Sequence, residues 1–124
     1  MFITIDTSER RPIYEQVADQ IKELIARGEL SEGAALPPVR QLAADIGVNM
    51  NTIAVAYREL QIEGLITIKH GSGAVVASRV ARTTDEEELR KPLRNALTGL
   101  VLAGLTSRRI MQIVTEEIGE LSQK

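Results

Sequence analysis

Apolar residues recur with helical spacing in five stretches of the chain, separated by glycines and polar turns. The first stretch contains Ile13, Val17, Ile21, Leu24 and Ile25. This spacing predicts a helix from Arg11 to about Arg27, closed by Gly28 and followed by a loop to Ala35. The next two stretches predict shorter helices at about Val39–Ile46 and Met50–Glu63.

The two shorter helices have the spacing of a helix-turn-helix. Ala43 lies four residues before Gly47, and Ile53 lies six residues after it. A small residue suits the helix crossing, a glycine suits the turn, and an apolar residue anchors the second helix. This geometry leaves one face of the second helix free to enter a DNA major groove.

Two β-rich runs follow directly. Gly64 has the character of a residue just beyond a helix end, and Ile66–Ile68 and Ala74–Val76 flank a glycine-containing turn. A helix-turn-helix followed by a hairpin predicts a winged helix. We expect a DNA-binding domain over residues 1–77 and a polar, basic linker over residues 78–84.

The last part of the chain predicts two more helices. Acidic residues from Asp85 to Glu88 suit a helix N-terminus, Gly104 ends this helix, and Thr106 can cap the next one. Pro92 predicts a kink or a restart, because proline removes a helical hydrogen bond.

The apolar stripes of these two helices are too large to be buried against each other alone. We therefore expect residues 85–124 to form a dimerisation segment whose interface contains Leu93, Leu97, Leu100, Val101, Ile110, Ile113, Val114 and Ile118. A ligand pocket between the helices is the alternative, although no polar cluster marks it. The fold class is mainly α with a small β wing: a winged helix-turn-helix followed by a two-helix appendage.

Composition narrows the possible functions. The chain has 124 residues, no cysteine and one histidine, so thiol catalysis and common zinc sites are not expected, and we expect no cofactor. No catalytic constellation is recognisable, which argues against an enzyme. No apolar run approaches the roughly 20 residues of a membrane span, and the start does not resemble a signal peptide. We expect a cytoplasmic protein.

The net charge of −2 is unusual for a DNA-binding protein, but the charges are unevenly distributed. Between Gly33 and Arg58 the only acid is Asp45, and residues 64–84 contain no acid. The acids gather on the first helix and near the C-terminus. The predicted DNA-binding surface is therefore basic to neutral, although so few cations predict weak binding by a single chain.

An ordered series of residues resembles the GntR family of bacterial transcription regulators. It comprises Ile21, Gly28, Leu30, Gly33, Leu36-Pro37, Arg40, Leu42-Ala43, Gly47-Val48, Thr52, Ala56-Tyr57, Leu60, Glu63-Gly64-Leu65-Ile66 and Gly71-Ser72-Gly73. Residues 12–16 and 49–52 resemble the short YtrA-like branch. The resemblance covers about residues 10–77 and implies a winged-helix regulator that binds an operator.

The candidate DNA-binding residues follow from the motif. The planar guanidinium of Arg40 can contact phosphate and base edges, and the resemblance supports that role. Asn49 suits a helix cap with a phosphate contact, Asn51 suits adenine readout, and Thr52 offers a hydroxyl and a methyl group. The alternative for Asn49 is capping alone, and for Thr52 it is packing.

Five further positions are less specific. Packing and phosphate contact are both open for Tyr57, and Arg58 can reach phosphate or pair with an acid. Lys69, His70 and Gly71 form the predicted wing tip, and the resemblance implies that the wing contacts DNA.

The sequence departs from the wider GntR pattern at three positions. Met50 and Ala54 stand where many members have arginine, and Pro38 replaces a serine. Strong guanine readout is therefore not expected, and we predict an operator rich in A/T or recognised by its shape.

These observations favour a homodimeric regulator, expected to be a repressor, that binds double-stranded DNA at an inverted repeat. The resemblance implies control of a transporter operon and of its own gene, and an unknown small-molecule effector is possible in such a protein. The alternative is a winged helix that contacts another protein through its acidic first helix. An enzyme is the weakest alternative, and a membrane protein is not expected.

Overall fold

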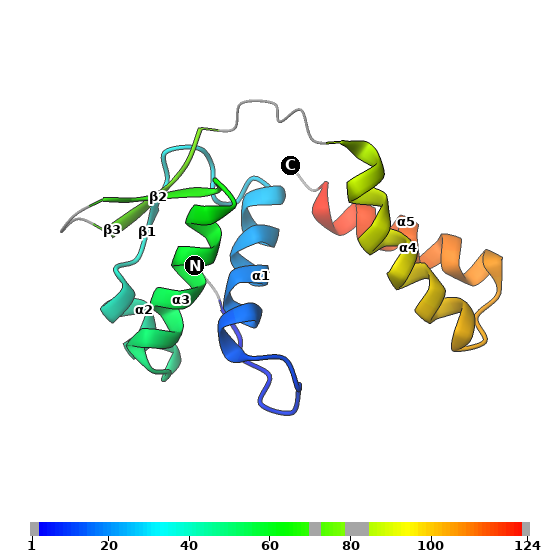
Figure 1. The fold of residues 1–124 in the computed structure, drawn as a ribbon, viewed down its shortest axis with the longest axis horizontal. Helices are drawn as coiled ribbons and strands as arrows, with labels where there is room; N and C mark the ends of the chain where they lie inside the picture. Colours follow the sequence, from blue (N-terminus) through cyan, green and yellow to red (C-terminus); the bar gives the residue numbers. More distant parts are fainter. Residues whose placement is uncertain (1–2, 70–72, 79–84, 123–124) are drawn as a thin grey trace. The chain divides into compact units, whose positions relative to one another are not determined.

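The computed structural model describes residues 3–69, 73–78 and 85–122, and the chain divides into two compact units. Unit 1 extends from Met1 to Arg79 and unit 2 from Val80 to Gln123. Of the predicted linker, residues 78–84, only Ser78 lies within the described residues. Figure 1 shows the elements of both units.

Unit 1 contains three helices and a small sheet. The helices are α1 (Ile13–Ala26), α2 (Val39–Ile46) and α3 (Met50–Ile62). Helices α1 and α3 lie side by side, and α2 packs against α3 (Figure 1). The predicted helix-turn-helix is thus formed by α2 and α3.

The core of unit 1 is mainly aliphatic. It includes Val17 and Ile21 from α1, Leu42 from α2, and Ile53 and Leu60 from α3, each no more than 2% exposed. Because these residues recur on one face of each helix, burying them turns the opposite faces outward.

Local signals fix the turn between α2 and α3. Gly47 ends α2 with φ of 69°, a left-handed conformation that glycine adopts readily. The backbone N–H of Val48 then donates to the carbonyl of Ala43 at 3.0 Å, and Val48 packs against the core. The first residues of α3 are thereby held at a defined place beside α2.

The sheet has three strands, one more than the hairpin that we predicted. β2 (Ile66–Lys69) and β3 (Gly73–Val76) pair antiparallel, and β1 (Ala35–Leu36) pairs with the other edge of β3. Ala35 lies opposite Val75, and Leu36 lies opposite Ala74. β1 therefore ties the segment that enters α2 to the wing.

The N-terminal residues are attached to α1 by two glutamine side chains. Buried Gln16 accepts a hydrogen bond from the backbone N–H of Asp6 at 2.9 Å and donates to the carbonyls of Asp6 and Arg11. Gln20 makes the same pair of bonds with the backbone of Thr4. Ile3 reaches the core as a result, which the sequence pattern did not predict.

Unit 2 is a pair of helices, α4 (Glu86–Leu102) and α5 (Ser107–Leu121), that fold back on each other (Figure 1). Asp85 caps α4 by accepting from the backbone N–H of Glu87 at 3.0 Å. Thr106 caps α5 by accepting from the backbone N–H of Arg109 at 3.2 Å, as predicted.

Of the kink or restart predicted at Pro92, the restart is excluded, because α4 continues through this residue. Proline cannot donate to the carbonyl of Glu88, one turn earlier. Glu88 and Pro92 are both exposed, so water can satisfy that carbonyl. The cost of the missing bond is therefore small enough for the helix to continue.

Candidate nucleic-acid interface

Helix α3 has one buried face and one exposed face. Ile53, Ala56, Tyr57 and Leu60 are buried in the core of unit 1. Met50, Asn51 and Arg58 are exposed, and Ala54 is partly exposed between them. Because residues spaced by four lie on one side of a helix, these outward residues form a continuous surface.

The N-terminus of α3 is capped by Asn49. Its side-chain oxygen accepts a hydrogen bond from the backbone N–H of Asn51 at 2.7 Å, which confirms the predicted cap. The side chain of Asn51 is exposed, whereas that of Thr52 is partly buried. Asn49 precedes the helix and Thr52 is partly buried. Asn51 is therefore the one of these three polar residues that is both exposed and part of α3.

Arg40 is the second residue of α2 and is exposed. Among the described residues, Arg40 forms no ion pair and no side-chain hydrogen bond. The same is true of Arg58 and Lys69. These three cations lie on α2, α3 and β2, the elements that the sequence assigned to DNA.

Cations near α1 behave differently. Arg11 pairs with Asp19 and Glu9, Lys22 pairs with Glu63 at 2.9 Å, and Arg27 pairs with Glu23 and Glu29. Much of the acidic charge of α1 is thus compensated within unit 1, which weakens the alternative of an acidic docking helix.

Tyr57 is a correction to the predicted surface. The structure places it in the core at 1% exposure, where its hydroxyl donates to the carbonyl of Pro37 at 2.6 Å. Burial raises the pKa of the Tyr57 phenol to about 12. A hydroxyl that is held inside the fold cannot contact phosphate, so packing is the role that the structure supports.

The wing can be placed only in part. Lys69 is exposed at the end of β2, opposite Gly73 on β3. His70 and Gly71, which the sequence assigned to the wing tip, lie outside the described residues.

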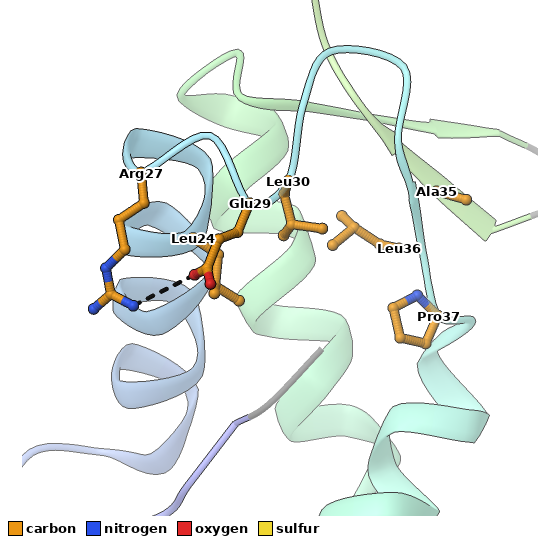
Figure 2. Close-up of a pocket in the computed structure, with 7 residues that line it drawn as sticks. All are labelled: Leu24, Arg27, Glu29, Leu30, Ala35, Leu36 and Pro37. Carbon is orange, nitrogen blue, oxygen red and sulfur yellow. Dashed lines mark hydrogen bonds and ion pairs between the residues drawn. The ribbon is translucent and has the colours of Figure 1, made fainter. Parts of the chain in front are cut away.

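A pocket of about 680 Å³ lies between the end of α1, the following loop and β1 (Figure 2). Leu24, Leu30, Leu36 and Pro37 give it apolar walls, and Arg27 pairs with Glu29 at its edge at 3.4 Å. Because the two charges compensate each other, the pocket presents no convergent polar group for a small ligand. The predicted small-molecule effector stays a prediction.

Unit 2 leaves most of its apolar surface uncovered. Ile110 is its one buried hydrophobic residue among those described, and Leu97, Leu100, Ile113 and Val114 are partly buried. Seven large apolar side chains are more than 40% exposed: Leu89, Leu93, Val101, Leu102, Met111, Ile118 and Leu121. We call these seven the apolar surface of unit 2.

Ile110 is a second correction. It was assigned to the dimer interface, but it is already buried between α4 and α5 in the single chain. It therefore has little area left to bury against a partner chain.

Comparison with known proteins agrees with this geometry. Residues 13–76 match the family model described as bacterial regulatory proteins, gntR family. This chain belongs to the GntR family. The HTH-type transcriptional repressor YtrA of Bacillus subtilis (strain 168) is 36% identical over 118 residues, which cover 92% of this chain and 90% of that protein.

Solved structures support the fold of this GntR-family protein. A structure described as a transcriptional antiterminator from Listeria monocytogenes EGD-e has a TM-score of 0.86 and 33% identity, and the match covers 98% of this chain and 92% of that one. The DNA-binding domain of AraR in complex with operator ORX1 has a TM-score of 0.53 and 28% identity, over 62% of this chain and 93% of that one.

The protein is therefore a DNA-binding transcription regulator of the GntR family, similar to YtrA, and not an enzyme. Its winged helix-turn-helix followed by two helices confirms the predicted architecture. Within the described residues, no helix is long and apolar enough to span a membrane, and no group of His, Asp or Glu side chains has the arrangement of a metal site.

Proposed function

We propose that the protein is a homodimeric repressor that binds an inverted-repeat operator. The observation that supports this proposal is the outward surface of α2 and α3, on which Arg40 and Arg58 pair with no acid among the described residues. Uncompensated cations on a helix-turn-helix suit phosphate contacts, which supply most of the affinity of such proteins.

The proposed contacts divide into two groups. We assign base contacts to Asn51 and Thr52, at the start of α3, and to Arg40, at the start of α2. Contacts to the DNA backbone or the minor groove are assigned to Asn49, Arg58, Lys69, His70 and Gly71. Recognition helices approach bases with their N-terminal residues, which is the end of α3 that carries Asn51 and Thr52.

Dimerisation is supported by the apolar surface of unit 2. Two short helices that leave seven large apolar side chains exposed are costly in water, and a second copy would cover them. A two-fold dimer would present two copies of α3, so its operator would be an inverted repeat with half-sites about one helical turn apart, or a multiple of it.

The regulated genes are proposed from the relatives alone. Similarity to a protein named a transcriptional repressor supports repression. Control of a transporter operon and of the protein's own gene rests on the family resemblance. Because bacterial operators lie in the cytoplasm, we propose that the protein acts there.

A gel shift with the DNA upstream of its own gene tests this proposal. We expect a shifted band with duplex DNA that an excess of unrelated DNA, or of RNA of the same sequence, does not remove. Absence of any shift at low salt would contradict the proposal.

Arg40→Ala should weaken this binding by about 1–3 kcal/mol if Arg40 contacts a base. If it contacts only phosphate, the salt dependence of binding should fall by about one unit of slope instead. Arg10→Ala is the matched control, because Arg10 is an exposed arginine of unit 1 outside α2 and α3. Equal losses for both variants would contradict a specific role for Arg40.

A further inference from the structure

Met50 is a large apolar side chain that the fold does not use. It is 47% exposed and is absent from the residues that form or line the core of unit 1. The neighbouring apolar residues Ile46, Val48 and Ile53 all pack against or within that core. Packing therefore does not explain why an apolar residue stands at this position.

The position is the first residue of α3, directly after the cap Asn49. Met50, Ala54 and Arg58 are spaced by four, so they follow one another along the outward side of the helix. The capping bond from Asn51 to Asn49 fixes the backbone on both sides of Met50. Its side chain thus leaves the protein at the end of α3 that enters the groove in a helix-turn-helix.

The chemistry of methionine restricts what it can recognise there. A thioether has no donor for guanine or adenine acceptors and is a weak acceptor. In the major groove, the one apolar group on a base edge is the C5-methyl group of thymine. A flexible, unbranched side chain can adjust to that methyl group and exclude water from it.

We propose that Met50 is a specificity-determining residue that recognises a thymine methyl group in each operator half-site. This inference rests on the proposed operator binding and adds one defined base contact to it. The contact gains affinity from apolar burial, and it favours thymine over cytosine at one position of the half-site.

Replacing thymine by deoxyuridine tests the proposal, because this change removes the methyl group and keeps the base pair. The half-site is first located by footprinting on the bound promoter fragment, and each thymine is then replaced in both half-sites at once. Removing one buried methyl group costs about four-fold in affinity, so two should cost about ten- to twenty-fold. Fluorescence anisotropy with the full chain measures this loss.

Three variants define the contact. Met50→Ala should bind the thymine operator more weakly and should no longer distinguish thymine from deoxyuridine at the sensitive position. Met50→Leu should keep the distinction, because it keeps an apolar side chain of similar size. Ile62→Ala, which removes a 72% exposed apolar side chain at the far end of α3, should behave as the wild type.

The outcomes separate this inference from the proposed function. Normal operator binding with no sensitive thymine, or sensitivity that persists in Met50→Ala, would overturn the role of Met50 alone. Failure of the wild type to bind any DNA would overturn both. Since Met50 is exposed, thermal unfolding of the variants should match that of the wild type.

Discussion

At the scale of single residues, Tyr57 connects α3 to the segment before α2. Its hydroxyl bonds to the carbonyl of Pro37, which lies next to β1 and just ahead of the helix-turn-helix. One partly buried hydrogen bond therefore links α3 to the segment between β1 and α2. Its role is to keep the outward residues of α2 and α3 in a fixed relation.

Tyr57→Phe should lower the free energy of unfolding at pH 7 by about 0.5–1.5 kcal/mol, because it removes this bond and leaves the carbonyl unpaired. Urea unfolding followed by circular dichroism measures the change. Tyr14→Phe is the control, since the Tyr14 hydroxyl makes no hydrogen bond within the described residues. A larger loss for Tyr14→Phe would contradict the assignment.

The same residue predicts a loss of stability at high pH. The Tyr57 phenol has a pKa of about 12 in the folded chain and near 10 in the unfolded chain. Below pH 10 both states hold the proton, so its stabilising contribution is complete. Between pH 10 and 12 the unfolded state alone ionises, so the free energy of unfolding falls across this window. This fall should be absent from Tyr57→Phe, and an identical fall in that variant would exclude Tyr57 as its cause.

At the scale of elements, the cap of α3 should contribute to stability. Asn49→Ala should cost about 0.5–2 kcal/mol of stability, because the backbone N–H of Asn51 loses its acceptor. Asn49→Ser should recover most of it, since serine is a comparable cap. Thermal unfolding measures both variants. If Asn49→Ala and Asn49→Ser are equally unstable, capping is not the function of this side chain.

Helix boundaries in unit 1 could be predicted because their signals are local. Gly47 and Asn49 mark the end of α2 and the start of α3, and both helices were predicted to within one residue at each end. β1 could not be predicted, since it has two residues and its partner β3 lies about 40 positions later. Strand pairing between residues so far apart in the sequence does not alter the local pattern of apolar and polar residues.

The candidate site was predicted less completely than the helices. The helical spacing of Tyr57 is compatible with burial in the core and with a position at the edge of the core. Its 1% exposure and its hydrogen bond to Pro37 decide for burial. The burial of Gln16 could not be predicted, because glutamine side chains are mostly exposed. The exposure of Met50 could not be predicted from the apolar spacing either, since an apolar residue at the start of a helix can be exposed or packed against the core.

At the scale of the whole molecule, we expect tight binding to need two chains. Each chain offers few uncompensated cations to DNA, and affinity rises with the number of phosphates neutralised. We propose that the apolar surface of unit 2 joins two chains. Dimerisation and operator affinity should therefore be lost together.

Leu93→Glu should convert a dimer into monomers, because it places a charge within the apolar surface of unit 2. Sedimentation velocity should show this change, and affinity for an inverted repeat should fall by about 100-fold or more while unit 1 stays folded. Ile62→Glu, at an exposed apolar residue of unit 1, should remain dimeric. A wild type that sediments as a monomer at micromolar concentration would contradict the role of unit 2.

The central claim is sequence-specific binding of a dimer to an inverted repeat, and selection from random duplex DNA with the full chain tests it most directly. We expect enrichment of one inverted repeat with A/T-rich half-sites, bound by two chains per duplex. Enrichment of a single half-site, of a G/C-dominated site or of no sequence at low salt would contradict it.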